Sequence, residues 1–299
     1  MIMNRSIVTK GIGMLIVSAS GFAFAMPFTP ILDEFWIVKS TDTAGPNEIF
    51  RDSFDDGVVP PSGPDGATTY FGVGHTAMTS ESGGKLTMTP SLGNLVSISG
   101  TTAEYSTTAS RLLATNPSNP NFLGEDSAFS IHGLFDMSNL PTVNGQSFGI
   151  RATDRALTMG NLGDNTYALF VGMSEITSDI TIALRHENFV TNVSTRLDSI
   201  SIQSLLSTAG QIELVFSKAA GASELLASYI LYDNNVTPGI LGSGSIGLGS
   251  MLSIYVGEDY IRGGFQSTDA VPVPEPATLA LLGIGIAGMT FARKGKAAA

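Results

Sequence analysis

The chain has 299 residues, of which 26 are acidic, 15 are basic and none is cysteine. A formal charge of −11 makes nucleic acid a poor partner. The lack of cysteine excludes thiol catalysis, disulfide bonds and zinc–thiolate centres. The length allows one large domain or two small ones, with enough buried surface to fold without disulfide bonds.

The N-terminal segment, residues 1–25, has the pattern of a secretory signal peptide. Arg5 and Lys10 give a basic start, an apolar stretch follows, and Ala23 and Ala25 form an A-x-A cleavage site. Such a leader implies export through the Sec translocon. A permanent membrane anchor is the alternative, but the apolar stretch is short and small residues lie at the cleavage position.

Residues 26–48 are expected to form an N-terminal extension before the main domain. This segment holds the only tryptophan of the chain, Trp36, within the apolar run Phe35–Val38. Trp36 either packs against apolar neighbours or offers a ring on which a sugar stacks. Its position inside an apolar run favours packing.

Residues 49–269 show the pattern of strands that bury one face. Apolar side chains recur at every second position, and clusters of Gly, Asn, Asp, Ser and Pro separate these runs. No helical period is sustained, and a single helical turn is expected near residues 203–208. The pattern predicts an all-β, two-sheet antiparallel sandwich. The residues predicted to face inward are Leu86, Met88, Phe129, Ile131, Gly133, Phe148, Ile150, Ala152, Tyr167, Leu169, Val171, Ile180, Ile182, Leu184, Ile212, Leu214, Phe216, Tyr229, Leu231, Leu252, Ile254 and Val256.

Several segments of this domain resemble the concanavalin A-like, or laminin-G-like, jelly rolls. The similarity is carried by Phe54-Asp55-Asp56-Gly57 and by residues 84–88, 129–135 and 141–151. The resemblance implies jelly-roll connections between the strands. It leaves the function open, because one fold hosts many functions and jelly rolls of this shape include glycanases.

Catalytic patterns are missing from the sequence. A retaining glycanase needs two carboxylates about 5–5.5 Å apart, commonly from alternating positions of one strand, and no Glu-x-Asp-x-Glu run occurs. Glu213 stands alone in an apolar strand and is expected to face solvent. His75, His132 and His186 lie far apart and are expected to be structural, and no nucleophile elbow stands between a strand and a helix. We therefore expect a non-catalytic domain, with a hydrolase or lyase acting on glycans as the alternative.

Two groupings have the composition of a sugar site, which combines an aromatic ring with amide or carboxylate groups. The first is Tyr232 followed by Asp233 and Asn234, and the second is Tyr255 with Glu258. Aromatic residues are scarce in this chain, and most phenylalanines fall at inward positions. The first grouping is the candidate ligand-binding site.

If the domain binds a cofactor, calcium is the one that the sequence favours. Ca²⁺ prefers several oxygen ligands from carboxylates and loop carbonyls, and Asp55 and Asp56 lie in an acidic loop. The loop does not follow a known ligand spacing. The alternative is that its Asp side chains cap turns through local hydrogen bonds.

The C-terminal segment has three parts. A proline-rich linker over residues 270–276 precedes an uncharged apolar run over 277–292, and a basic tail over 293–299 follows. The 16 residues of this run give roughly 24 Å of helix, somewhat less than the roughly 30 Å core of a bilayer. The basic tail favours the cytoplasmic side, so the domain before it is expected outside. A buried core helix is the alternative, but no polar face interrupts the run.

This arrangement resembles the PEP-CTERM sorting signal. The residues that carry the resemblance are Val273, Pro274, Glu275, Pro276, Arg293, Lys294 and Lys296. The resemblance implies recognition by an exosortase, a membrane protease-transferase of bacteria that make extracellular polysaccharide. It implies a precursor in the inner membrane, cut near residues 274–276 and delivered to the cell surface or the extracellular matrix. We therefore expect an exported sandwich that binds extracellular polysaccharide or has a structural role in the matrix.

Overall fold

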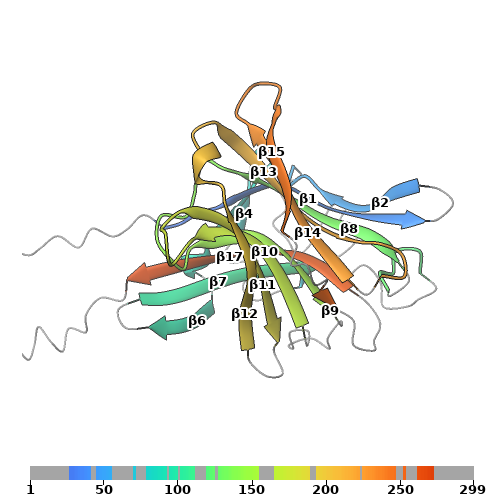
Figure 1. Cartoon of the computed structure of the whole chain (residues 1–299), viewed down its shortest axis with the longest axis horizontal. Coiled ribbons are helices and arrows are strands. Elements are labelled where there is room, and N and C mark those ends of the chain that lie inside the picture. The colour runs from blue at the N-terminus through green and yellow to red at the C-terminus, as the bar shows by residue number, and fades with distance from the viewer. Residues whose placement is uncertain are drawn as a thin grey trace, which may run out of the picture.

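The computed structural model describes residues 27–41, 45–55, 70–71, 79–92, 94–99, 102–111, 119–124, 127–154, 165–188, 193–222, 224–246, 252–253 and 261–272. These residues form two antiparallel β-sheets that pack face to face (Figure 1). The all-β, two-sheet sandwich predicted from the alternating pattern is confirmed.

The first sheet has nine strands. They are β1 (Ile31–Thr41), β2 (Gly45–Asp52), β4 (Thr79–Glu81), β5 (Leu86–Met88), β8 (Ala128–Asp136), β13 (Ala209–Lys218), β14 (Glu224–Asp233), β15 (Ile240–Ile246) and β16 (Leu252–Ser253). The order is β15-β14-β13-β8-β1-β5-β4, with β16 beside β14 and β2 beside β1.

Strand β1 occupies an interior position of this sheet. One of its edges pairs with β8, and the other pairs with β5 and then with β2. The prediction that residues 26–48 form an extension outside the sandwich is therefore corrected. The alternation was hidden because both faces of β1 carry large apolar groups, with Phe35 and Ile37 toward the core and Trp36 and Val38 on the other side.

The second sheet has eight strands. They are β3 (Tyr70–Phe71), β6 (Asn94–Ser99), β7 (Thr102–Arg111), β9 (Ser147–Asp154), β10 (Asn165–Met173), β11 (Ile180–Asn188), β12 (Val193–Ser201) and β17 (Ile261–Pro272). The order is β12-β11-β10-β9-β17-β7-β3, with β6 beside β7. The sheet twists strongly, since β7 and β17 run nearly horizontally in Figure 1 while β11 and β12 run nearly vertically.

The last strand reaches further than expected. Strand β17 lies between β9 and β7 and continues to Pro272, which pairs with Thr102. The first residues of the predicted 270–276 linker therefore belong to the sheet. Two short 3₁₀ turns, η2 (Pro90–Leu92) and η3 (Gln203–Leu205), complete the described elements, and the second lies where a helical turn was predicted.

Aromatic rings from both sheets fill the space between them. Phe35 of β1 and Phe265 of β17 meet edge to face with ring centroids 5.6 Å apart, and Phe135 and Phe148 lie 5.0 Å apart. Every apolar residue predicted to face inward is buried wherever the structure describes its side chain. The side chain of Leu252 is not among these, and Ile254 and Val256 lie outside the described residues.

Within the described ranges, no helix is long and apolar enough to cross a membrane. The signal segment 1–25 and the apolar run 277–292 both lie outside those ranges. The two predicted helices therefore stay predictions.

Candidate functional site

A row of aromatic and charged side chains crosses the outer face of the nine-stranded sheet. Strand β8 alternates between buried and half-exposed positions, which places every second side chain away from the core. The register sets Trp36 beside Arg51 of β2 on one side and beside His132 of β8 on the other. Glu213 of β13 and Tyr232 of β14 continue the row. We call Arg51, Trp36, His132, Glu213 and Tyr232 the outer-face cluster.

Trp36 is enclosed between its two neighbours. The imidazole of His132 stacks on the indole with ring centroids 4.7 Å apart and an angle of 11° between the planes. The guanidinium carbon of Arg51 lies 4.8 Å from the indole centroid, within the range of a cation–π contact. Because β2 and β8 flank β1 on opposite sides, these groups cover opposite faces of the ring. Trp36 thus packs, as the sequence favoured, but on the outer face rather than in the core.

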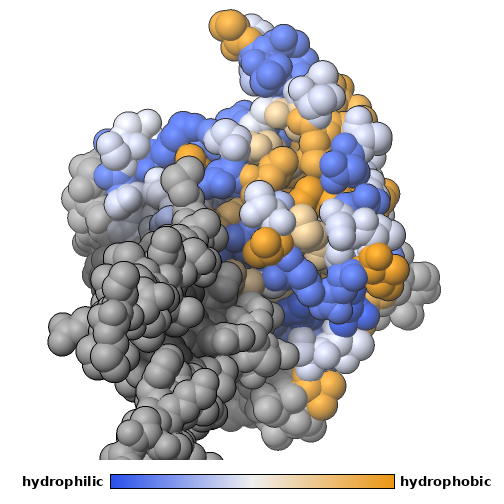
Figure 2. All heavy atoms as spheres, turned by 90° about the vertical axis from the view of Figure 1, so that its left-hand side faces the viewer, coloured by the Kyte–Doolittle hydropathy of each residue, from blue (hydrophilic) through white to orange (hydrophobic). Residues whose placement is uncertain are grey.

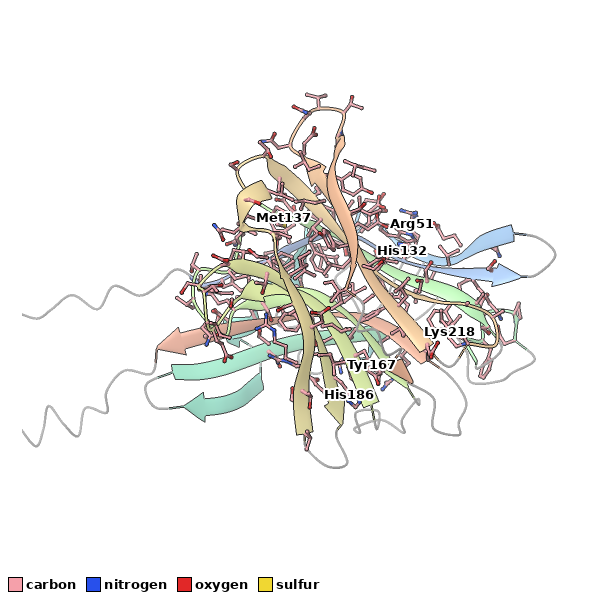
Figure 3. All side chains as sticks on the ribbon, viewed as in Figure 1. Arg51, His132, Met137, Tyr167, His186 and Lys218 are labelled. Atoms are coloured by element: carbon pink, nitrogen blue, oxygen red, sulfur yellow. The ribbon has the colours of Figure 1, made fainter. Side chains whose placement is uncertain are left out.

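Arg51 is held by two carboxylates on the solvent side of the cluster. It donates hydrogen bonds to Glu34 of β1 and, at 2.8 Å from Nε, to Glu48 of its own strand. The bond to Glu48 raises the pKa of Arg51, which remains fully charged. Figure 3 shows Arg51 and His132 close together above the sheet. The end of the cluster is therefore a fixed cation.

Glu213 is the buried centre of the cluster. Its side chain accepts hydrogen bonds from His132 Nδ1 at 2.8 Å and from the Tyr232 hydroxyl at 2.8 Å. The other ring nitrogen of His132 lies 2.6 Å from Ser130 Oγ. The residue is only 9% exposed, so the prediction that it faces solvent is wrong. It does point away from the core, but long side chains from the two neighbouring strands cover it.

Burial and hydrogen bonds together set the protonation states of Glu213 and Tyr232. Burial alone would raise the pKa of Glu213, but the hydrogen bonds from His132 and Tyr232 outweigh it and lower the pKa. Burial, together with the hydrogen bond to Glu213, raises the pKa of Tyr232 to about 12. Near neutral pH, Glu213 is therefore an ionised acceptor and Tyr232 a protonated donor.

The lowered pKa of Glu213 predicts a pH-dependent contribution to stability. The contribution is present in full above about pH 4.5, the ordinary glutamate value, and is lost as the pH falls through the lower folded-state pKa. We expect Glu213→Gln to destabilise the protein most near neutral pH, and the difference from wild type to shrink in acid. Urea unfolding across this pH range measures the difference in the free energy of unfolding between the variant and wild type. Glu175→Gln, in the exposed turn after β10, is the control. A difference that is constant with pH would contradict the role of the charge.

The two described histidines have different surroundings. His132 belongs to the outer-face cluster, whereas His186 of β11 stacks on the buried Tyr167 of β10 with centroids 4.7 Å apart. Figure 3 shows this second pair on the other sheet. His75 lies outside the described residues. Each described histidine thus packs against an aromatic ring of the adjacent strand.

The three residues of the candidate ligand site point to different places. Tyr232 contacts Glu213, whereas Asp233 accepts hydrogen bonds from the backbone nitrogens of Asn235 at 3.1 Å and Gly239 at 3.0 Å. The bond from Gly239 lowers the pKa of Asp233. Asn234 is exposed. Asp233 therefore closes the loop between β14 and β15, and Tyr232 joins the cluster instead.

The loop between β14 and β15 projects from the top of the molecule in Figure 1. The uppermost atoms in Figure 2 are apolar and stand on a polar stem, and Val236 of this loop is fully exposed. Both carboxylate oxygens of Asp233 accept bonds inside the loop. The loop is thus shaped by its own hydrogen bonds rather than by packing.

The predicted calcium ligands are placed only in part. Asp55 is exposed and Asp56 lies outside the described residues, while the neighbouring Asp52 accepts a hydrogen bond from the backbone nitrogen of Phe54 at 3.1 Å. Across the part of the chain that the structure describes, no three His, Asp or Glu side chains lie close enough to hold a metal ion.

The remaining predicted residues lie outside the described ranges. They are Ala23, Ala25, Tyr255, Glu258, Val273, Pro274, Glu275, Pro276, Arg293, Lys294 and Lys296.

The sheet ends where the sorting-signal pattern begins, because Pro272 closes β17. Residues 272–294 match the PEP-CTERM protein-sorting motif. A PEP-CTERM motif implies export, processing by an exosortase and sorting to the cell surface. No curated protein and no solved structure matches the chain. The PEP-CTERM match thus accounts for the C-terminal segment, and the function of the sandwich must be argued from its geometry.

Proposed function

We propose that the protein is a non-catalytic component of the bacterial cell surface or extracellular matrix whose sandwich binds extracellular polysaccharide. The Sec translocon exports the chain, the run 277–292 holds the precursor in the inner membrane, and the exosortase cuts near residues 274–276. The sandwich, with the strand connections of a concanavalin A-like jelly roll, is the part that is delivered to the cell surface or matrix. The PEP-CTERM motif supports the sorting steps.

The outer-face cluster is the observation that carries the glycan part of the proposal. It crosses the five adjacent strands β2, β1, β8, β13 and β14, which at about 4.8 Å per strand gives a strip about 19 Å wide. A polysaccharide is a chain of sugar rings that carry hydroxyl groups. The strip offers such a chain a cation, the edges of aromatic rings and hydrogen-bonding groups. Because both faces of Trp36 are covered, the sugar meets the edge of the indole rather than its face.

The cluster is also rigid before any ligand arrives. Arg51 is held by Glu34 and Glu48, and Glu213 is held by His132 and Tyr232. Side chains that are already fixed lose little rotamer entropy when a ligand binds, which favours affinity. The protonation states support a binding role over acid–base catalysis. The lowered pKa of Glu213 makes it a weak base, and a tyrosine with a pKa of about 12 gives up its proton poorly.

Binding of the exported protein to the extracellular polysaccharide of its own cells tests the proposal. We expect Trp36→Ala and Glu213→Gln each to weaken binding about tenfold or more, because each removes a group that holds the cluster together. Glu175→Gln, in the exposed turn between β10 and β11 of the opposite sheet, is expected to bind like wild type. Thermal unfolding of each variant separates lost binding from lost folding.

The same assay distinguishes the other roles. Wild-type protein that binds no polysaccharide, with or without calcium, would contradict the glycan proposal and favour a structural role. Release of reducing ends or unsaturated sugars from the polysaccharide would contradict the non-catalytic part and favour the hydrolase or lyase.

A further inference from the structure

An arginine is buried on the outer face of the eight-stranded sheet, far from the outer-face cluster in the sandwich. In β9 the side chains of Ile150 and Ala152 enter the core, so the side chain of Arg151 between them points the other way. It is nevertheless only 3% exposed. A buried charge is costly unless it is paired and hydrogen-bonded, so its partners decide what this residue does.

The described partners of Arg151 do not use its full hydrogen-bonding capacity. Its Nη2 donates to Thr166 Oγ1 at 3.2 Å, and Thr166 Oγ1 lies 3.0 Å from Thr153 Oγ1. Its Nε is buried and has no hydrogen-bond partner in the part of the chain that the structure describes. The carboxylate that acts on it through space, Glu187, is itself 3.9 Å from Arg185. A buried guanidinium is ordinarily hydrogen-bonded to an anion. Arg151 is instead hydrogen-bonded to the neutral hydroxyl of Thr166.

A second cation stands beside the first. Arg262 of β17 is 9% exposed and pairs in register with Thr153, while Arg151 pairs with Gly264 two residues further along β17. The two arginine residues are thus diagonal neighbours in the register, on one face of the sheet. Burial lowers the pKa of Arg151 to about 10, and the charge of Arg262 contributes to the lowering. An anion beside Arg151 would favour its charged form and so oppose both of these effects on its pKa.

The immediate neighbours of Arg151 on this face are small. Ala168 of β10 and Gly264 of β17 lie directly opposite it in the register, one on each side. Neither residue is large enough to cover the guanidinium group, so the low exposure of Arg151 comes from other parts of the molecule. The Nε and Nη atoms of arginine form a planar fork that matches the two oxygens of a carboxylate.

We propose that Arg151, with Thr153, Thr166 and Arg262 around it, forms a binding site for a carboxylate, such as the acid group of a uronic acid. The low exposure of Arg151 requires a small occupant, which is a free acid or the end unit of an acidic saccharide. The site does not depend on the proposed function, because it lies on the other sheet.

Arg196 of β12 provides a matched control. It also donates from Nη2 to a threonine hydroxyl, that of Thr181, at 3.2 Å, and it pairs in register with Arg185 of β11. Unlike Arg151, however, it is exposed. The two arginines therefore share chemistry and hydrogen-bond geometry, and they differ in burial.

Thermal unfolding of the exported protein in increasing sodium galacturonate, at constant ionic strength with chloride, tests the site. We expect the unfolding midpoint of wild type to rise by a few degrees and to keep rising with concentration, as for a ligand bound only by the folded state. Arg151→Met should abolish the rise, whereas Arg196→Met should retain it. Galactose, which lacks the carboxylate, should have no effect.

Two further measurements identify the kind of carboxylate that binds and keep the test decisive. Acetate that raises the midpoint as much as galacturonate would assign the site to carboxylates in general, and a weaker effect of acetate would assign it to sugar acids. If Arg151→Met does not fold, Arg151→Lys keeps the charge without the fork and should reduce the rise. No rise in wild type, or an equal rise in the Arg151 variants, would overturn the site. Loss of polysaccharide binding with the galacturonate response intact would overturn only the proposed function.

Discussion

Replacing Glu275 with alanine is expected to leave the full-length precursor uncut, with nearly complete loss of the mature form outside the cell. Glu275 stands at the centre of the proline-rich part of the matched PEP-CTERM motif. Deleting residues 293–296 should have the same result, because the basic residues hold the end of the chain on the cytoplasmic side. Immunoblots of membrane, surface and medium fractions measure the precursor and the mature form.

The control for the sorting variants is Glu175→Ala, which removes an exposed carboxylate outside the motif and is expected to be processed like wild type. Normal processing of the Glu275 variant and of the deletion would contradict the assignment of this segment as the sorting signal.

Replacing Phe265 with alanine is expected to lower the free energy of unfolding by about 3–5 kcal/mol. Phe265 is 1% exposed and contacts Phe35 of the facing sheet edge to face, with ring centroids 5.6 Å apart. It also meets Phe54, at 6.2 Å. Its removal leaves a cavity between the sheets and removes two aromatic contacts. Urea unfolding monitored by circular dichroism gives the value.

Two comparisons make the Phe265 prediction specific. Phe265→Leu should lose less stability, because it keeps most of the buried volume, and Ile176→Ala should have little effect, because Ile176 is 93% exposed. A loss below about 1 kcal/mol in Phe265→Ala would contradict the packing of the two sheets through this residue.

The alternating pattern predicted the fold because the period of a strand is local. Side chains such as Ile131, Leu169 and Leu214 follow a two-residue period that needs no knowledge of their partners, and all three are buried. Strand β1 was missed because Trp36 and Val38 place apolar groups on its outer face as well. A continuous apolar run does not show which side chains face the core.

The candidate sites were harder to predict, because alternation gives the direction of a side chain and not what covers it. Glu213 and Arg151 both point outward, as their positions indicate, yet both are buried. The partners of Glu213 are 81 and 19 residues away in the chain, at His132 and Tyr232, and no local pattern connects them. The only sequence feature that pointed to this site was Glu213 itself, a lone charged residue in an apolar strand.

The sandwich and its sorting signal are directly joined. Pro272 is both the last residue of β17 and the first residue of the matched motif. A cut near residues 274–276 therefore falls within a few residues of an interior strand of the eight-stranded sheet. The exosortase would therefore act next to the folded domain.

Mass spectrometry of the protein recovered outside the cell tests the central claim most directly. The account predicts a chain that begins at Met26 and ends near residues 274–276, without the apolar run and the basic tail. Exported protein that still carries Ala299 would contradict it.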